Sequence, residues 1–132
     1  MILVDSSVWI DYFNGKESWQ TDYLDNSLGG KIISIGDLML AEVLQGFAND
    51  KHYTQAREAL LIIPCLPICS KAVALKSANN YRILRTNGIT VRKTIDMLIA
   101  TFCIEQELSL LHADKDFDYI GSFLPLQIIK AI

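Results

Sequence analysis

Short apolar runs alternate with longer stretches of helical periodicity along the whole chain. The first run, Ile2–Val4, is unbroken and then meets polar residues, which is typical of a strand that is buried on both faces and ends at the edge of a sheet. Asp5 follows this strand directly. Apolar residues between positions 8 and 13 recur at helical spacing, and we expect Ser6 or Ser7 to cap that helix through a side-chain oxygen.

The same alternation continues to the end of the chain. Further strands are predicted at residues 31–35, 65–69, 108–112 and 126–129. Helices are predicted at residues 19–28, 38–47, 53–63, 71–86, 95–107 and 115–120, with Thr94 as the expected cap of the helix from 95. Pro67 removes a ladder donor and favours an edge position for the 65–69 strand. The pattern therefore predicts an α/β fold in which a central, mostly parallel sheet of about five strands carries helices on both faces.

Composition limits the class of protein. The 132 residues suit one domain, and although 51% are hydrophobic, no apolar run approaches the roughly 18 residues of a membrane span. The chain opens on a strand and an acid rather than on a basic, apolar export signal, so we expect a cytoplasmic protein with no membrane partner. The three cysteines lack metal-ligand spacing, so buried, reduced thiols are expected at Cys65, Cys69 and Cys103.

Two acids interrupt helices that are otherwise apolar nearly all round, a pattern that predicts helices buried on every side. Glu42 lies within residues 38–44 and Asp96 within residues 95–100. A buried carboxylate costs several kcal/mol unless something compensates its charge, so each acid needs a partner. One explanation is local, because the free N–H groups and the dipole at a helix start favour a negative charge. The other is a shared cation.

The positions of the remaining acids favour a shared cation. Asp114 follows the predicted strand at 108–112, as Asp5 follows the first strand, and Asp116 comes two residues later. Taken alone, Asp114 is best interpreted as a helix N-cap. The carboxyl ends of parallel strands meet at one sheet edge, however, where Asp96 would also begin its helix. Carboxylates gathered there repel one another, and a hard divalent cation such as Mg²⁺ or Mn²⁺ would compensate them.

Such a site also changes how the net charge is interpreted. At −3, the chain lacks the excess of Lys and Arg that is usual in proteins that bind nucleic acids. Removing five acids (Asp5, Glu42, Asp96, Asp114 and Asp116) from the count leaves +2. The surface outside the site would therefore be mildly basic.

Four blocks of sequence resemble those of a known family. Residues 1–10 (MILVDSSVWI), 41–44 (AEVL), 94–100 (TIDMLIA) and 110–117 (LLHADKDF) are similar, in order and spacing, to the four motifs of PIN-domain ribonucleases, specifically VapC-type toxins of toxin–antitoxin pairs. No single block is specific for the family, whereas the four together are. The resemblance spans essentially all of residues 1–132. It implies a single PIN domain with a three-layer fold.

The resemblance implies specific roles for these residues. The catalytic, metal-binding quartet would be Asp5, Glu42, Asp96 and Asp114, with Asp116 as an accessory metal ligand. The implied activity is Mg²⁺-dependent hydrolysis of RNA phosphodiester bonds, with Mn²⁺ as a substitute and the ion held mainly by Asp5 and Asp96. The implied partners are RNA, a cognate VapB-type antitoxin and a second copy of the chain. Apolar residues at 44, 47, 53 and 60 agree with such a homodimer, although each also suits a core position.

Three further residues are candidates for contacting substrate. Ser6 occupies the place of the small hydroxyl residue that follows the first acid of the family, where Thr is commoner. Arg92 and Lys93 precede the helix of Asp96, so they are placed to hold RNA phosphates, or else are solvated loop charges.

Two alternative functions belong to other classes. A receiver-like phosphoacceptor module also gathers carboxylates around Mg²⁺ on a flavodoxin-like sheet. Such modules carry an acidic pair after the first strand, whereas this chain has Ser6 and Ser7 after Asp5. The second alternative is an inactive PIN scaffold that binds partners alone. Loss of one acid would favour it, and this chain keeps all of them.

Overall fold

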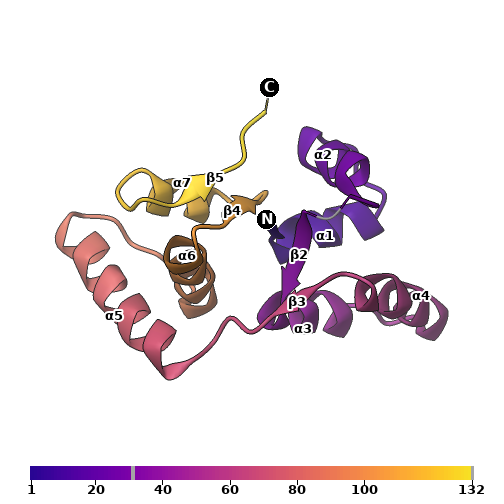
Figure 1. Ribbon diagram of the computed structural model, residues 1–132, viewed down its shortest axis with the longest axis horizontal. Coiled ribbons are helices and arrows are strands. Elements are labelled where there is room, and N and C mark those ends of the chain that lie inside the picture. Colours follow the sequence, from indigo (N-terminus) through magenta and orange to yellow (C-terminus); the bar gives the residue numbers. More distant parts are fainter. Residues whose placement is uncertain (31, 132) are drawn as a thin grey trace.

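Parallel strands form one sheet in the order β3-β2-β1-β4-β5 (Figure 1). The computed structural model describes residues 1–30 and 32–131, so Lys31, at the start of a predicted strand, lies outside the described residues. The strands are β1 (Ile2–Val4), β2 (Ile33–Gly36), β3 (Cys65–Leu66), β4 (Ser109–Leu111) and β5 (Gln127–Ile128). In the central strand, Leu3 pairs with Ser34 of β2 and with Leu110 of β4. The predicted parallel sheet and the edge position of β3 are confirmed.

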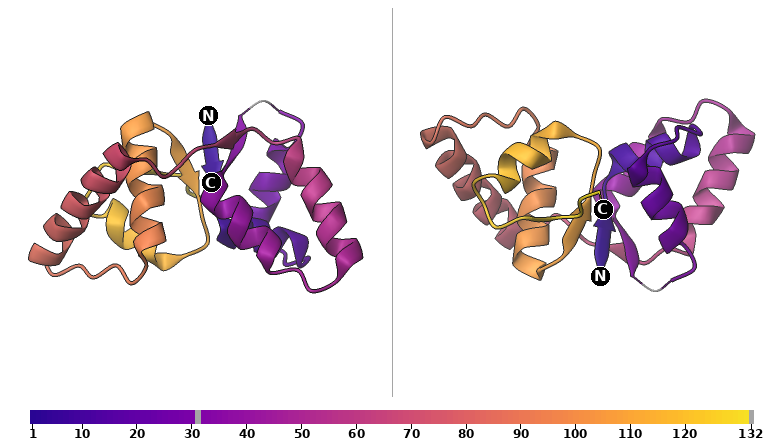
Figure 2. Two further views of the ribbon diagram at one scale, coloured as in Figure 1. Left: turned by 90° about the horizontal axis from the view of Figure 1, so that it is seen from below. Right: turned by 90° about the horizontal axis from the view of Figure 1, so that it is seen from above.

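Helices cover both sides of this sheet. They are α1 (Ser6–Phe13), α2 (Trp19–Ser27), α3 (Asp37–Gln45), α4 (Asp50–Leu61), α5 (Lys71–Thr86), α6 (Thr94–Gln106) and α7 (Lys115–Gly121). Helices α1 to α4 gather on one side of β1 and α5 to α7 on the other (Figures 1 and 2). The three-layer α/β prediction is therefore confirmed, and no described helix has the length and apolarity needed to cross a bilayer.

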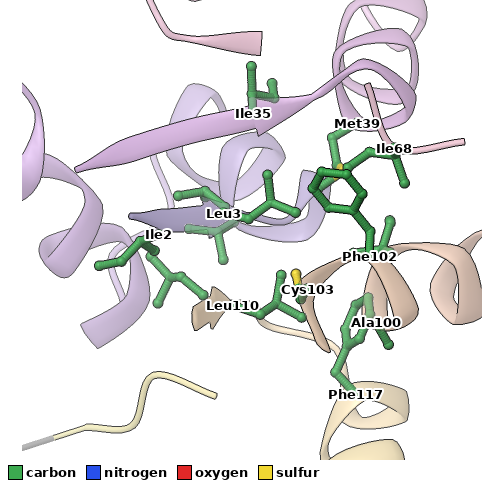
Figure 3. Close-up of a cluster of buried hydrophobic side chains, with 14 of the residues drawn as sticks. Ile2, Leu3, Ile35, Met39, Ile68, Ala100, Phe102, Cys103, Leu110 and Phe117 are labelled. Carbon is green, nitrogen blue, oxygen red and sulfur yellow. The ribbon is translucent and has the colours of Figure 1, made fainter. Parts of the chain in front are cut away.

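The core lies where the central strands meet α6. Leu3, Leu110 and Cys103 are each 0% exposed and belong to one buried cluster (Figure 3). Phe102 of α6 extends this cluster toward Met39 of α3. Asp96 lies in the part of α6 that is buried nearly all round, so its carboxylate is carried into the interior, as the apolar sequence around it predicted.

The strand order places a switch point between β1 and β4. From β1 the chain adds β2 and then β3 on one side, and it returns to add β4 and β5 on the other. In open α/β sheets, ligands bind outside the carboxyl ends of the strands at such a point. The N–H of Asp5 donates to the carbonyl oxygen of Leu111 at 2.9 Å, so the ends of β1 and β4 are joined there.

Two predicted helix caps are wrong. Asp5 itself is the N-cap of α1, with extended backbone and a carboxylate that accepts from the N–H of Ser7, so neither Ser6 nor Ser7 has this role. Lys93 is the N-cap of α6 without a side-chain hydrogen bond, and Thr94 is already helical. The first residue of each helix depends on where the preceding extended segment ends, and the local sequence does not determine that position.

Two predictions about burial are also wrong. Cys65 and Cys69 are exposed, because β3 is a two-residue edge strand, and Cys103 alone of the three cysteines is buried. Helix α3 buries one face, including Met39 and Val43, rather than its whole circumference. Glu42 is consequently half-buried.

Candidate metal centre and active site

Asp5 occupies the carboxyl end of the central strand and is 4% exposed. Its Oδ2 accepts hydrogen bonds from the backbone N–H of Ser7 at 3.1 Å and from the Ser7 hydroxyl at 2.6 Å. Burial raises the pKa of Asp5 above 3.8, while the bonds from Ser7 and the proximity of His112 oppose the rise. Asp5 is therefore a buried acid with one oxygen already held in place.

Ser7 is a site residue that the sequence analysis missed. Its hydroxyl donates to Asp5 and accepts from the backbone N–H of Ala113 at 3.0 Å. It therefore links the segment after β1 to the segment after β4. The signal in the sequence is a hydroxyl residue two positions after an acid at a strand end, a pattern that equally suits a helix cap.

A compact carboxylate group lies at the start of α6 and α7. Asp96, Asp114 and Asp116 each offer an oxygen, and these oxygens all lie within 4.8 Å of one another. Asp96 is the third residue of α6, whereas Asp114 is the N-cap of α7 and accepts from the N–H of Asp116 at 3.0 Å. The interpretation of Asp114 as an N-cap is thus confirmed, and the same residue also belongs to the group.

Two oxygens of this group have no hydrogen-bond partner. Oδ2 of Asp96 and Oδ2 of Asp116 are buried and accept no hydrogen bond from the part of the chain that is described. Arg92 Nε lies 3.7 Å from Asp116 Oδ2, but its side chain is 78% exposed, so the charge it offers is strongly screened. Unsatisfied buried carboxylate oxygens are costly, and the group has the hard oxygen ligands that Mg²⁺ and Mn²⁺ prefer. These residues therefore fit a divalent cation.

Burial and charge repulsion both act on the pKa of Asp96. Burial, and then the negative charges of Asp5, Asp114 and Asp116, raise its pKa from 3.8 to about 7, against the opposing charge of Lys93. The effect of Asp5 on this pKa places its charge close to Asp96. However, Asp5 is not a member of the group of three whose oxygens all lie within 4.8 Å of one another.

Glu42 approaches the same region from α3. The hydroxyl of Ser6 donates to its Oε1 at 3.4 Å. Burial, followed by the charge of Asp5, raises the pKa of Glu42 above 4.5, while Ser6 and Lys93 lower it. The structure thus brings Glu42 and Ser6 beside Asp5. Lys93 acts on the protonation of both Asp96 and Glu42, so its charge is close to both acids.

His112 supports the loop that carries Asp114. The side chain is buried, and its Nδ1 accepts from the backbone N–H of Asp114 at 3.1 Å. This bond leaves the ring proton on Nε2, which faces Oδ1 of Asp118 at 3.2 Å. The ring also packs against Phe117, with a centroid separation of 5.2 Å. These roles of His112 depend on loop geometry that periodicity does not show.

The strand order decides against one alternative function. Flavodoxin-like receiver modules have the order 2-1-3-4-5, whereas the order here is 3-2-1-4-5. The receiver interpretation is therefore wrong.

Comparison with known proteins agrees with this geometry. The PIN domain family matches residues 2–122. The VapC ribonuclease Mb1587 of Mycobacterium bovis is 30% identical over 129 residues, which are 96% of each chain. Among solved structures, FitAcB from Neisseria gonorrhoeae covers 98% of this chain and 97% of its own, with a TM-score of 0.77 and 18% identity. A toxin–antitoxin complex from Klebsiella pneumoniae has the same coverage and identity with a TM-score of 0.74. Because both the PIN family model and the VapC ribonuclease of Mycobacterium bovis match nearly the whole length of this chain, it belongs to the PIN-domain family and, within it, to the VapC ribonucleases.

Proposed function

We propose that this protein is a divalent-metal-dependent endoribonuclease toxin that hydrolyses RNA phosphodiester bonds, with Mg²⁺ as its ion and Mn²⁺ as a substitute. Residues 1–132 would act as a single PIN domain in the cytoplasm. The observation that carries the proposal is the group of Asp96, Asp114 and Asp116 at the sheet's switch point, with two buried oxygens that accept no hydrogen bond from residues 1–30 and 32–131. Kinship with a protein named as a ribonuclease supports RNA as the substrate.

Each acid has a distinct part in this reaction. Asp96, Asp114 and Asp116 would hold the metal, and a divalent cation held there would supply acidification of the attacking water and positive charge for the scissile phosphate. Glu42 is half-buried with a raised pKa, which suits it to accept the proton of the attacking water. Asp5 adds negative charge beside Asp96 and, like Glu42, is a further candidate ligand.

The neighbouring residues position these acids and the substrate. Ser7 fixes one oxygen of Asp5, and His112 fixes the backbone of Asp114. Arg92 and Lys93 are cations just before the start of α6 and would attract the RNA phosphates. Ser6 would orient Glu42 through its hydroxyl.

The test is cleavage of total RNA by the purified full chain, with Mg²⁺ or with EDTA. We expect cleavage that requires the metal and is abolished in Asp96→Asn. The matched control is Asp22→Asn, which neutralises an exposed acid on α2 and should cleave normally. Full cleavage in EDTA or by Asp96→Asn would refute the proposal. A folded wild type that cleaves no RNA would favour the inactive PIN scaffold.

The acid group also suggests how the enzyme is neutralised. A cognate VapB-type antitoxin can insert an Arg, whose planar fork of donors suits carboxylates, beside Asp96 and Asp114. The Klebsiella relative, which is a toxin–antitoxin complex, supports a partner of this kind. We expect a co-expressed partner to inhibit cleavage and to bind the Asp96→Asn/Asp114→Asn variant more weakly. Equal affinity for both forms would place inhibition on another surface.

A second copy of the chain is also proposed as a partner. Leu44 and Phe47 are half-buried, and Tyr53 is 37% exposed, so these side chains are available for an apolar contact. Leu60 is 2% exposed and belongs to the core instead. Light scattering of wild type and Tyr53→Glu tests the dimer, which the variant should weaken. A wild type that is monomeric at high concentration would contradict it.

A further inference from the structure

A cleft of about 400 Å³ opens beside the carboxylate group. It is formed by the start of α2, the loop between β4 and α7, and the chain after β5. Asp114 lines this cleft and also contributes to the carboxylate group, so the two sites are continuous. The volume is within the range of about 300 to 1,000 Å³ that is usual for small-molecule sites, so one nucleotide unit would fit.

One wall of the cleft is an exposed aromatic side chain. Trp19 is 38% exposed, whereas the other tryptophan, Trp9, is 2% exposed. Every nucleobase has a π-face that can stack on an aromatic ring, whatever its sequence. Ile128 and Ile129 supply further apolar surface in the cleft. A flat, apolar ligand such as a base would therefore find complementary surface.

The charges in the cleft suit a phosphate-linked ligand. Lys115 and Lys130 both line it and are exposed. Of the acids that line it, Asp118 lies beside His112, with 3.2 Å between Oδ1 and Nε2, and Asp114 belongs to the carboxylate group. The two lysines are therefore available to phosphates on either side of a bound nucleotide.

We propose that this cleft binds a nucleotide of single-stranded RNA next to the scissile phosphate, with its base stacked on Trp19 and its phosphates facing Lys115 and Lys130. This inference rests on the proposed ribonuclease function and adds the subsite that holds the strand. The cleft would thereby contribute to which RNA segment reaches the acids.

Tryptophan fluorescence measures binding directly. The probe is a short single-stranded oligoribonucleotide, titrated in EDTA into Asp96→Asn, a background in which we expect no cleavage. Stacking on Trp19 should quench its emission, while the buried Trp9 is unaffected. Adding Trp19→Phe to this background should abolish the quenching signal. The variant should keep most of the affinity, measured by the anisotropy of a labelled probe, because a Phe ring also stacks on a base.

Alanine and glutamine variants then test the surface. Trp19→Ala should weaken binding about 5- to 150-fold, the measured range for one base–aromatic stack. Lys130→Gln should weaken it less and flatten its salt dependence. The matched controls are Phe123→Ala, which removes an aromatic ring that is 48% exposed, and Lys71→Gln on α5, neither of which lines the cleft. Both should bind as the parent does, and melting curves check that each variant is folded.

The outcomes separate this inference from the proposed function. If wild type cleaves RNA and Trp19→Ala, in the otherwise wild-type chain, shows a raised KM, both are supported. If wild type cleaves and the folded Trp19→Ala and Lys130→Gln variants bind and cleave normally, the subsite is overturned and the ribonuclease remains. If wild type cleaves nothing but the probe still quenches Trp19, the ribonuclease is overturned and the binding site remains. Absence of both cleavage and quenching overturns both.

Discussion

The hydroxyl of Ser7 lies 2.6 Å from Oδ2 of Asp5, and the same hydroxyl accepts the N–H of Ala113 at 3.0 Å. One side chain therefore fixes the orientation of a buried acid and joins the ends of the two central strands. A hydrogen bond to a charged group contributes more than a neutral one, so this contact is a strong local constraint.

Removing this hydroxyl should impair both stability and catalysis. We expect Ser7→Ala to lower the free energy of unfolding by about 1.5 to 3 kcal/mol, because the bond involves a carboxylate. It should also lower kcat about tenfold with little change in KM, because Asp5 loses its orientation rather than substrate contact. Denaturant titration and cleavage kinetics measure the two effects. Ser6→Ala is the control and should be milder, since its bond to Glu42 is 3.4 Å long. Equal effects of the two variants would contradict the assignment.

Metal binding should stabilise the folded protein through Asp96. Because the ion binds the folded state in preference to the unfolded one, wild type should gain about 2.7 kcal/mol at a hundredfold excess of Mg²⁺ over its Kd. Asp96→Asn should gain much less, since one of the three convergent carboxylates loses its negative charge. The measurement is thermal melting in EDTA and in rising Mg²⁺ at fixed ionic strength, with Asp22→Asn as the control. Identical responses of wild type and Asp96→Asn would show that Asp96 is a helix-start acid without a metal.

The metal-free protein should lose stability as pH rises. The pKa of Asp96 in the folded protein is about 7, above its ordinary value of 3.8. At pH values between these two, the folded state therefore holds a proton on Asp96 that the unfolded chain has released. Unfolding then takes place with proton release, and the stabilisation present at low pH is lost as pH rises through about 7.

Replacing this acid by a neutral isostere should remove that part of the pH dependence. In EDTA, Asp96→Asn should be more stable than wild type by about 1 to 4 kcal/mol near pH 8, with a smaller difference near pH 5, because the folded acid is already neutral there. Denaturant titrations across this range provide the measurement. A difference that does not change with pH would contradict the raised pKa.

His112 should act through the acceptor at Nδ1. His112→Asn keeps an oxygen close to the position of Nδ1 and can still accept from Asp114, whereas His112→Gln favours the longer reach toward Asp118. We expect the Asn variant to retain several-fold more kcat than the Gln variant, with KM similar in both. Cleavage kinetics on one RNA substrate compare them. The reverse order would assign the main role to the contact with Asp118.

Much of the fold was predictable because its determinants are local. Ile2–Val4 forms a strand and Thr94–Gln106 a helix because of apolar patterns that lie within a few residues. The strand–helix alternation then leads to a parallel sheet, since parallel strands need crossover connections. The four motif blocks also identified Asp5, Glu42, Asp96 and Asp114 as acids that the fold brings into one region, and the charge effects among them agree.

The arrangement within that region was decided by tertiary structure alone. Asp116, for which the family resemblance implies only an accessory role, belongs to one group with Asp96 and Asp114, while one oxygen of Asp5 accepts a hydrogen bond from Ser7. These contacts join residues far apart in the chain; Ser7 and Ala113, for example, are separated by 106 positions. The distances between such residues depend on the strand order and on how α6 and α7 pack against the sheet. Contacts between distant segments of the chain supply the energy that determines this packing. Sequence periodicity determines which residues belong to a strand or a helix, whereas long-range packing determines which of their oxygens meet.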